Sequence, residues 1–131
     1  MALQNDYVMR TISDLVRAIA GLALGKSDID YELPASEEKD LPVDRLYRRL
    51  QAMADAGDIN DAENLLYEEL DTGDKGYLEA ALAFYMHLNQ FGDEYLYTAN
   101  YSREEIVEGI NNVAAEFGIS GFEHFVDTTM V

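Results

Sequence analysis

The chain has 131 residues, of which 48% are hydrophobic and 11% aromatic, and this length and composition predict one folded domain rather than a disordered segment. It contains no cysteine, which excludes disulfides, thiolate metal sites and cysteine nucleophiles and fits a reducing compartment. The formal net charge is −17, and the chain from Leu50 onward holds 2 of the 9 basic residues but 17 of the 26 acidic residues. Such a polyanion repels phosphate backbones and anionic lipids, so we expect no nucleic-acid or membrane partner.

The first predicted element is a helix over residues 5–24, where apolar residues recur at spacings of three and four. Asn5 or Asp6 is expected to cap its first turn, and Gly25 to end it. Its last part, IAGLALG, is apolar on almost every side. We therefore expect that end to be covered by the rest of the domain or by a second copy of the chain, which predicts a homo-oligomer.

No membrane span or secretory leader is expected in this region. The longest uncharged run, Ala18 to Gly25, is far shorter than the 18 or more residues that a membrane helix needs. Asp6 and Asp14 interrupt the basic, apolar pattern of a signal peptide. The cytoplasm is therefore the expected location.

An acidic connection over residues 26–41 separates the first helix from a helical core over residues 42–131, all within one domain (residues 1–131). In its middle, Ile29, Tyr31 and Leu33 alternate with acidic residues, the two-residue period of an extended segment. This segment is either an arm lying over the helices or a strand, and the only candidate partner strand is residues 95–101.

The core begins with two helices, from Pro42 to Ala56 and from Asp58 or Asn60 to Leu70, separated by Gly57. The glycine ends one helix, and the small Ala62 allows the other to approach closely. This pair resembles a single degenerate tetratricopeptide unit, but no second unit follows at the expected spacing. A third helix over residues 75–91 is apolar on nearly every side and is expected to be central.

The C-terminal part carries the clearest local signals. Ser102 and Glu105 predict a capping box at the start of a helix that ends near Gly118. Gly109 lies within that helix, where it weakens helix formation, so we expect a close helix crossing there. Residues 92–101 are tyrosine-rich and suit a short helix, a loop or a strand, and residues 120–131 suit one amphipathic turn using Phe122, Phe125 and Val126.

Together these elements predict an all-α fold of five or six helices, with a tetratricopeptide-like hairpin and a central apolar helix. The N-terminal phrase QNDYVMRTI also resembles the start of an uncharacterised bacterial family of small acidic helical proteins with a DYxMRxI pattern, a domain of unknown function. The resemblance implies an all-helical protein but no activity. Its matching residues are Asp6, Tyr7, Met9, Arg10 and Ile12.

The one basic cluster in this acidic chain is formed by Arg45, Arg48 and Arg49 on the helix over residues 42–56. This cluster is a candidate contact for an anion or an acidic peptide. The same arginines could instead neutralise glutamates of the next helix, and this internal pairing is the use that we expect. The glutamates are Glu63, Glu68 and Glu69. A possible interaction surface comprises Tyr7, Arg10, Arg45, Arg48, Arg49, Tyr95, Tyr97 and Tyr101.

No metal or cofactor site is expected. A calcium loop starting at Asp71 would place Lys75 and Leu82 where oxygen ligands belong. His124 has only Glu123 and Asp127 near it in sequence, too few groups for a closed zinc site. Phosphate-binding loops and catalytic motifs are likewise missing from the sequence.

The function is not specified by any motif. We expect a small cytoplasmic interaction or adaptor module that binds a protein partner or itself. The alternative is a small enzyme or ligand-binding protein with a pocket between helices, built from scattered groups such as Glu79, Tyr85 and His87.

Overall fold

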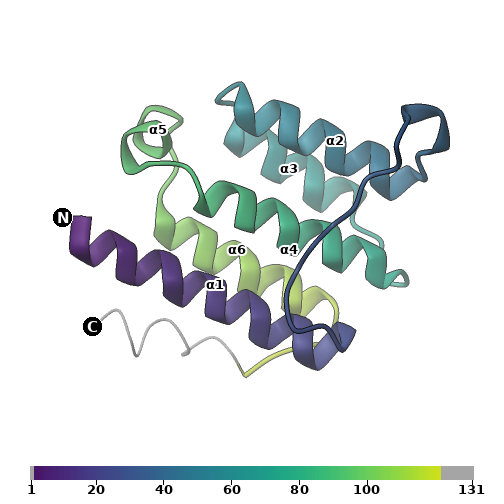
Figure 1. Ribbon diagram of the computed structural model, residues 1–131, viewed down its shortest axis with the longest axis horizontal. Coiled ribbons are helices and arrows are strands. Elements are labelled where there is room, and N and C mark those ends of the chain that lie inside the picture. Colours follow the sequence, from purple (N-terminus) through teal and green to yellow (C-terminus); the bar gives the residue numbers. More distant parts are fainter. Residues whose placement is uncertain (1, 122–131) are drawn as a thin grey trace.

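Six α-helices and one 3-10 turn follow one another in the computed structural model, which describes residues 2–121 (Figure 1). In chain order they are α1 (Ala2–Leu24), η1 (Glu37–Lys39), α2 (Pro42–Asp55), α3 (Ile59–Glu69), α4 (Lys75–Asn89), α5 (Asp93–Thr98) and α6 (Arg103–Glu116). No strand occurs within residues 2–121. The predicted all-α class is confirmed.

Helix α4 is the centre of the fold. It contacts the α2–α3 pair on one side and α1 and α6 on the other, and α1 also contacts α6 (Figure 1). Its residues from Ala80 to Tyr85 are all buried, which explains why the sequence of this helix is apolar on nearly every side. The prediction of a central helix is therefore correct.

The close crossing expected at Gly109 lies between α4 and α6. A methyl group on Gly109 would overlap the ring and hydroxyl of Tyr85, a side chain that is fully buried. Glycine is thus required at this position because Tyr85 occupies the space that any other side chain would need. The packing of α6 on α4 depends on this contact.

The predicted helix ends are mostly present. The Ser102 hydroxyl accepts from the Glu105 backbone amide at 3.3 Å, and the Ser102 amide donates to the Glu105 carboxylate at 2.8 Å, which is the expected capping box. At the other end of α6, Gly118 has φ +80° and the Ile119 amide donates to the Ala114 carbonyl at 2.9 Å. Gly57, with φ +89°, ends α2.

The start of the first helix differs from the prediction. Helix α1 begins at Ala2, so Asn5 and Asp6 lie inside it and neither is its cap. The residues before them, Ala2, Leu3 and Gln4, all favour helix, and no glycine or proline stops the helix from extending to them.

Residues 28–33 and 95–101, each of which suited a strand among other structures, do not form strands. Residues 95–98 belong to α5, and residues 28–33 form an irregular arm. The arm lies on α2, where the Tyr31 ring contacts the Tyr47 ring at 4.6 Å between centroids and its hydroxyl donates to Asp44 at 2.7 Å. The predicted turn containing Phe122, Phe125 and Val126, and also His124, lies outside the described residues.

The apolar end of α1 is partly buried and partly exposed. Ile19 and Ala20 are fully buried, whereas Leu22 is 67% exposed. Among the described helices, none combines the length and the hydrophobicity needed to cross a bilayer.

A candidate binding cleft lined by arginines

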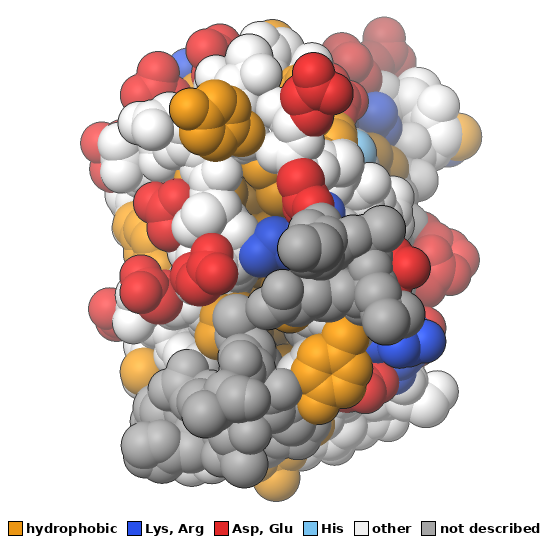
Figure 2. All heavy atoms as spheres, turned by 90° about the vertical axis from the view of Figure 1, so that its left-hand side faces the viewer, with side chains coloured by type: hydrophobic (Ala, Val, Ile, Leu, Met, Phe, Trp, Pro, Cys, Tyr) orange, Lys and Arg blue, Asp and Glu red, His pale blue; other side chains and the backbone are white. Residues whose placement is uncertain are grey.

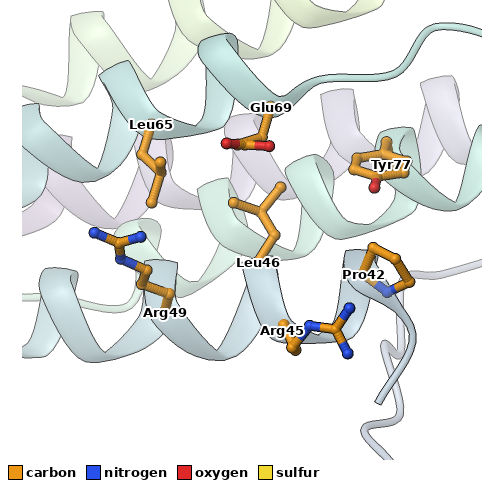
Figure 3. Close-up of a pocket in the computed structure, with 7 residues that line it drawn as sticks. All are labelled: Pro42, Arg45, Leu46, Arg49, Leu65, Glu69 and Tyr77. Atoms are coloured by element: carbon orange, nitrogen blue, oxygen red, sulfur yellow. The ribbon is translucent and has the colours of Figure 1, made fainter.

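Helix α2 places Arg45 and Arg49 one turn apart on the same face, because residues four apart in a helix lie above one another. That face borders α3 and the start of α4, and a cleft opens between the three helices (Figure 3). We call it the arginine cleft. It is lined by Pro42, Arg45, Leu46, Arg49, Leu65, Glu69 and Tyr77.

The floor of the arginine cleft is apolar and its rim is charged. Leu46 of α2 and Leu65 of α3 point toward each other across the cleft, while Arg49 and Glu69 lie on opposite sides of them (Figure 3). The cleft has a volume of about 250 Å³. A ligand held there would meet both charged groups and aliphatic surface.

The two arginines of the cleft have no carboxylate partner among the described residues. Arg45 donates from Nη1 to the Asp40 backbone carbonyl at 2.9 Å, and Arg49 forms neither a hydrogen bond nor an ion pair with any residue from 2 to 121. Glu69 lines the same cleft without pairing with either arginine. Both positive charges are therefore available to a ligand.

The electrostatic surroundings of the cleft are mixed. Burial raises the pKa of the Tyr77 hydroxyl above its ordinary value, and the carboxylates of Asp71, Asp74 and Glu69 raise it further, while Arg45 lowers it. Elsewhere acidic groups dominate, as on the end of the molecule that carries α5, where acidic side chains greatly outnumber basic ones (Figure 2). The cleft is thus a local cationic site on an anionic protein.

Arg48 faces away from the cleft and holds the connection before α2. Its Nε donates to Asp40 at 2.8 Å and its Nη2 donates to the Pro34 carbonyl at 2.8 Å. The Asp40 side chain is 1% exposed, and its second oxygen has no hydrogen-bond partner. Arg48 therefore compensates a buried carboxylate.

The expected pairing of the three arginines with α3 is wrong. Within residues 2–121, no ion pair joins Arg45, Arg48 or Arg49 to Glu63, Glu68 or Glu69. The reason is that the connection folds back over α2, so that Asp40 and the Pro34 carbonyl reach Arg48 before α3 does.

The other predicted interaction residues are spread over the molecule. Tyr7 and Arg10 are exposed on α1, and Tyr97 is 85% exposed on α5. Tyr95 is half-buried and donates to the Ala54 carbonyl at 2.7 Å, and Tyr101 is buried. Arg45 and Arg49 are therefore the members of the predicted set that share the cleft.

Sequence reasoning missed a partly buried cluster around Glu63. Its carboxylate accepts from the Tyr85 hydroxyl at 2.5 Å and from the Tyr101 hydroxyl at 3.0 Å, and the Tyr67 hydroxyl lies 3.4 Å from that of Tyr85. Burial raises the pKa of Glu63, although both tyrosine bonds lower it, and burial likewise raises the pKa of Tyr85 and Tyr101 above their ordinary range. Tyr85 and Tyr101 follow Glu63 by 22 and 38 positions in the sequence, so no local spacing could have revealed that both bond to it.

Comparison with known protein families gives a match over most of the chain. A family model described as a family of unknown function, DUF6483, matches residues 2–118, almost the whole described chain. The chain belongs to this family. No curated protein and no solved structure matches it.

In this member of the DUF6483 family, the groups considered for an enzyme site do not meet. Glu79 pairs with Lys26, His87 is bonded to Asp55 at 2.7 Å, and Tyr85 is bonded to Glu63, so the three side chains of α4 engage three different elements. The part of the chain that the structure describes also contains no group of three or more potential metal ligands. The arginine cleft, with Arg49 unpaired among the described residues, is the candidate site.

Proposed function

We propose that this protein is a small interaction module that binds a protein partner at the arginine cleft. The observation that supports this most is the state of Arg49, which lines the cleft and forms no hydrogen bond or ion pair within the described chain. Arginine is a common energetic anchor in protein interfaces. Two such side chains beside an apolar floor provide both the charge and the apolar area that an anchor site requires.

The size of the cleft favours a protein partner over a small molecule. Its volume of about 250 Å³ lies below the range of roughly 300–1,000 Å³ typical of small-molecule sites. It has room for one or two side chains of a larger partner.

Capture from a native cell lysate tests this proposal when wild type is compared with two variants of equal charge. One is Arg45→Gln/Arg49→Gln in the cleft. The other is the control Arg10→Gln/Lys39→Gln, which changes two exposed cations whose side chains make no hydrogen bond or ion pair among the described residues. We expect the same partner with wild type and the control, and its loss with the cleft variant. Equal recovery with all three, or recovery of the protein alone, would refute the proposal.

We also propose that the module self-associates through the C-terminal end of α1. Leu22 is 67% exposed there and borders a hollow of about 270 Å³. Leu78 of α4 and Phe117 and Ile119 after α6 form its apolar side, and Thr72 and Lys75 also line it. Sedimentation equilibrium should give a mass above that of one chain for wild type and for Tyr97→Glu, and the monomer mass for Leu22→Glu. A wild-type protein that is monomeric at every concentration would contradict this part.

The cytoplasmic location expected from the sequence is part of the same proposal. Fractionation of the native cells with an antibody to the protein checks it, and recovery in the membrane or secreted fraction would contradict it.

A further inference from the structure

The arginine cleft combines two cations that have no carboxylate partner among the described residues, an aliphatic floor and one carboxylate, and this combination limits what can occupy it. We propose that its occupant is an extended segment of the partner protein in which an acidic residue adjoins an apolar one. The inference rests on the proposed function and adds to it the chemistry of the partner.

The arginine pair indicates an anionic group in the partner. Like charges four residues apart on a helix destabilise it slightly, so Arg45 and Arg49 side by side bring no benefit to α2 by themselves. Neither is neutralised by a carboxylate of the described chain. The planar guanidinium matches the two oxygens of a carboxylate, and the pair therefore fits an aspartate or glutamate side chain.

The acidic groups near the cleft favour a carboxylate over a phosphate. Glu69 lines the cleft opposite Arg49 (Figure 3). Asp71 and Asp74 are near enough to raise the pKa of the Tyr77 hydroxyl, which also lines the cleft. A doubly charged anion would meet repulsion from these three carboxylates. A singly charged group that contacts the arginines is opposed less, and Glu69 can accept a hydrogen bond from a backbone amide of the same segment.

The apolar floor selects the neighbouring residue. Leu46, Leu65 and Pro42 leave a volume of about 250 Å³, roughly that of eight water molecules in the liquid. An aliphatic side chain that fills this space displaces water from both leucines, which is favourable. The acidic group then lies at the rim, where the arginines are.

Nuclear magnetic resonance titration of the full chain with capped pentapeptides tests this inference. The probes are acetylated, amidated Gly-Ser-Leu-Glu-Gly and three relatives in which Leu-Glu is replaced by Leu-Gln, Ser-Glu or Leu-Lys. We expect the Leu-Glu peptide to shift the Arg49 Nε–H and Leu65 signals. The Leu-Gln peptide should bind at least about tenfold more weakly, because one charge-assisted hydrogen-bonding group is lost.

A matched variant and an inorganic ion complete the design. Arg49→Lys keeps the charge but loses the planar fork, and we expect it to bind the Leu-Glu peptide more weakly than wild type does, whereas Arg10→Lys should bind it equally. Tighter binding of the Leu-Lys peptide, or equal shifts with sodium phosphate, would overturn the inference.

The outcome also separates this inference from the function on which it rests. If no peptide shifts the cleft signals while lysate capture still depends on Arg45 and Arg49, the partner chemistry is wrong and the module remains. If capture does not depend on the two arginines, the proposed function itself fails.

Discussion

Tyr85 of α4 donates a 2.5 Å hydrogen bond to Glu63 of α3 while its ring lies against Gly109 of α6. One buried side chain thus joins three helices, by a polar contact at its hydroxyl and by close packing along its ring. The same carboxylate accepts a second bond, from Tyr101, which precedes α6. Stability should therefore be sensitive to changes at either contact.

Gly109→Ala should destabilise the protein, because the added methyl group would overlap the Tyr85 ring and hydroxyl. Overpacking a core costs about 1–3 kcal/mol, and the higher helix propensity of alanine returns about 1 kcal/mol. The difference is a net loss of up to about 2 kcal/mol, measured by urea unfolding. Gly21→Ala is the matched control, since a methyl group at this helical glycine finds its nearest neighbour at 3.8 Å. The Gly21→Ala variant should be as stable as wild type or slightly more stable. If Gly109→Ala were also as stable as wild type, the contact between Gly109 and Tyr85 would not determine how α4 and α6 pack.

The stability of the protein should depend on pH through Glu63. Burial raises its pKa in the folded state, an effect that Glu105 and Glu108 increase and the bonds from Tyr85 and Tyr101 reduce. The folded state therefore binds this proton more tightly than the unfolded state does. The resulting stabilisation is complete below the unfolded pKa of about 4.3 and is lost as pH rises through the folded pKa.

Glu63→Gln isolates this contribution, because glutamine stays neutral and its carbonyl can still accept from both tyrosines. Relative to wild type, the variant should gain stability as pH rises from 4 toward 7, in urea unfolding at a series of pH values. Glu68→Gln, an exposed change on the same helix, is the control and should follow wild type. A difference between Glu63→Gln and wild type that does not vary with pH would contradict the assignment.

The sequence was sufficient where the signal was local. The capping box of Ser102 and Glu105 involves residues three apart, and the αL stop at Gly118 involves the last turn of α6, so each follows from backbone chemistry alone. Gly109 could also be recognised, because a glycine in a helix needs compensation by packing. The identity of its neighbour, Tyr85, could not be, because that contact depends on how α4 and α6 cross.

The candidate site was only partly predictable for the same reason. The spacing on α2 identified Arg45, Arg48 and Arg49 as one basic cluster, and two of them do share a cleft. The spacing could not show that the third turns to Asp40, because this depends on the path of an irregular connection. Glu63 was assigned to the arginines on helix adjacency, whereas the structure directs it to two tyrosines from other elements.

Arg103→Lys should be destabilising although the charge is kept. The buried guanidinium donates to the Asn89 carbonyl at 3.0 Å, the Phe91 carbonyl at 2.6 Å and the Asp93 carboxylate at 3.0 Å, and a single ammonium cannot reach all of these positions. Leaving acceptors at the end of α4 unpaired should cost about 1–3 kcal/mol. Thermal unfolding measures this loss. Arg17→Lys, which changes two exposed ion pairs, should stay within about 0.5 kcal/mol of wild type. Similar results for the two variants would refute the anchoring role of Arg103.

Substitutions of the adjacent residues Arg48 and Arg49 on α2 should distinguish an effect on stability from an effect on binding. Arg48→Met leaves the Asp40 carboxylate buried without its ion-pair partner, and one oxygen of that carboxylate already lacks a hydrogen bond. We therefore expect the free energy of unfolding to fall by about 2–4 kcal/mol. Arg49→Met removes no hydrogen bond or ion pair within the described residues and should change stability by less than about 0.5 kcal/mol while abolishing capture of the partner. Adding Asp40→Asn to Arg48→Met removes the buried charge and should restore part of the lost stability, as measured by urea unfolding. If Arg49→Met instead destabilised the protein as strongly as Arg48→Met, Arg49 would have a structural role and would not be free to bind a partner.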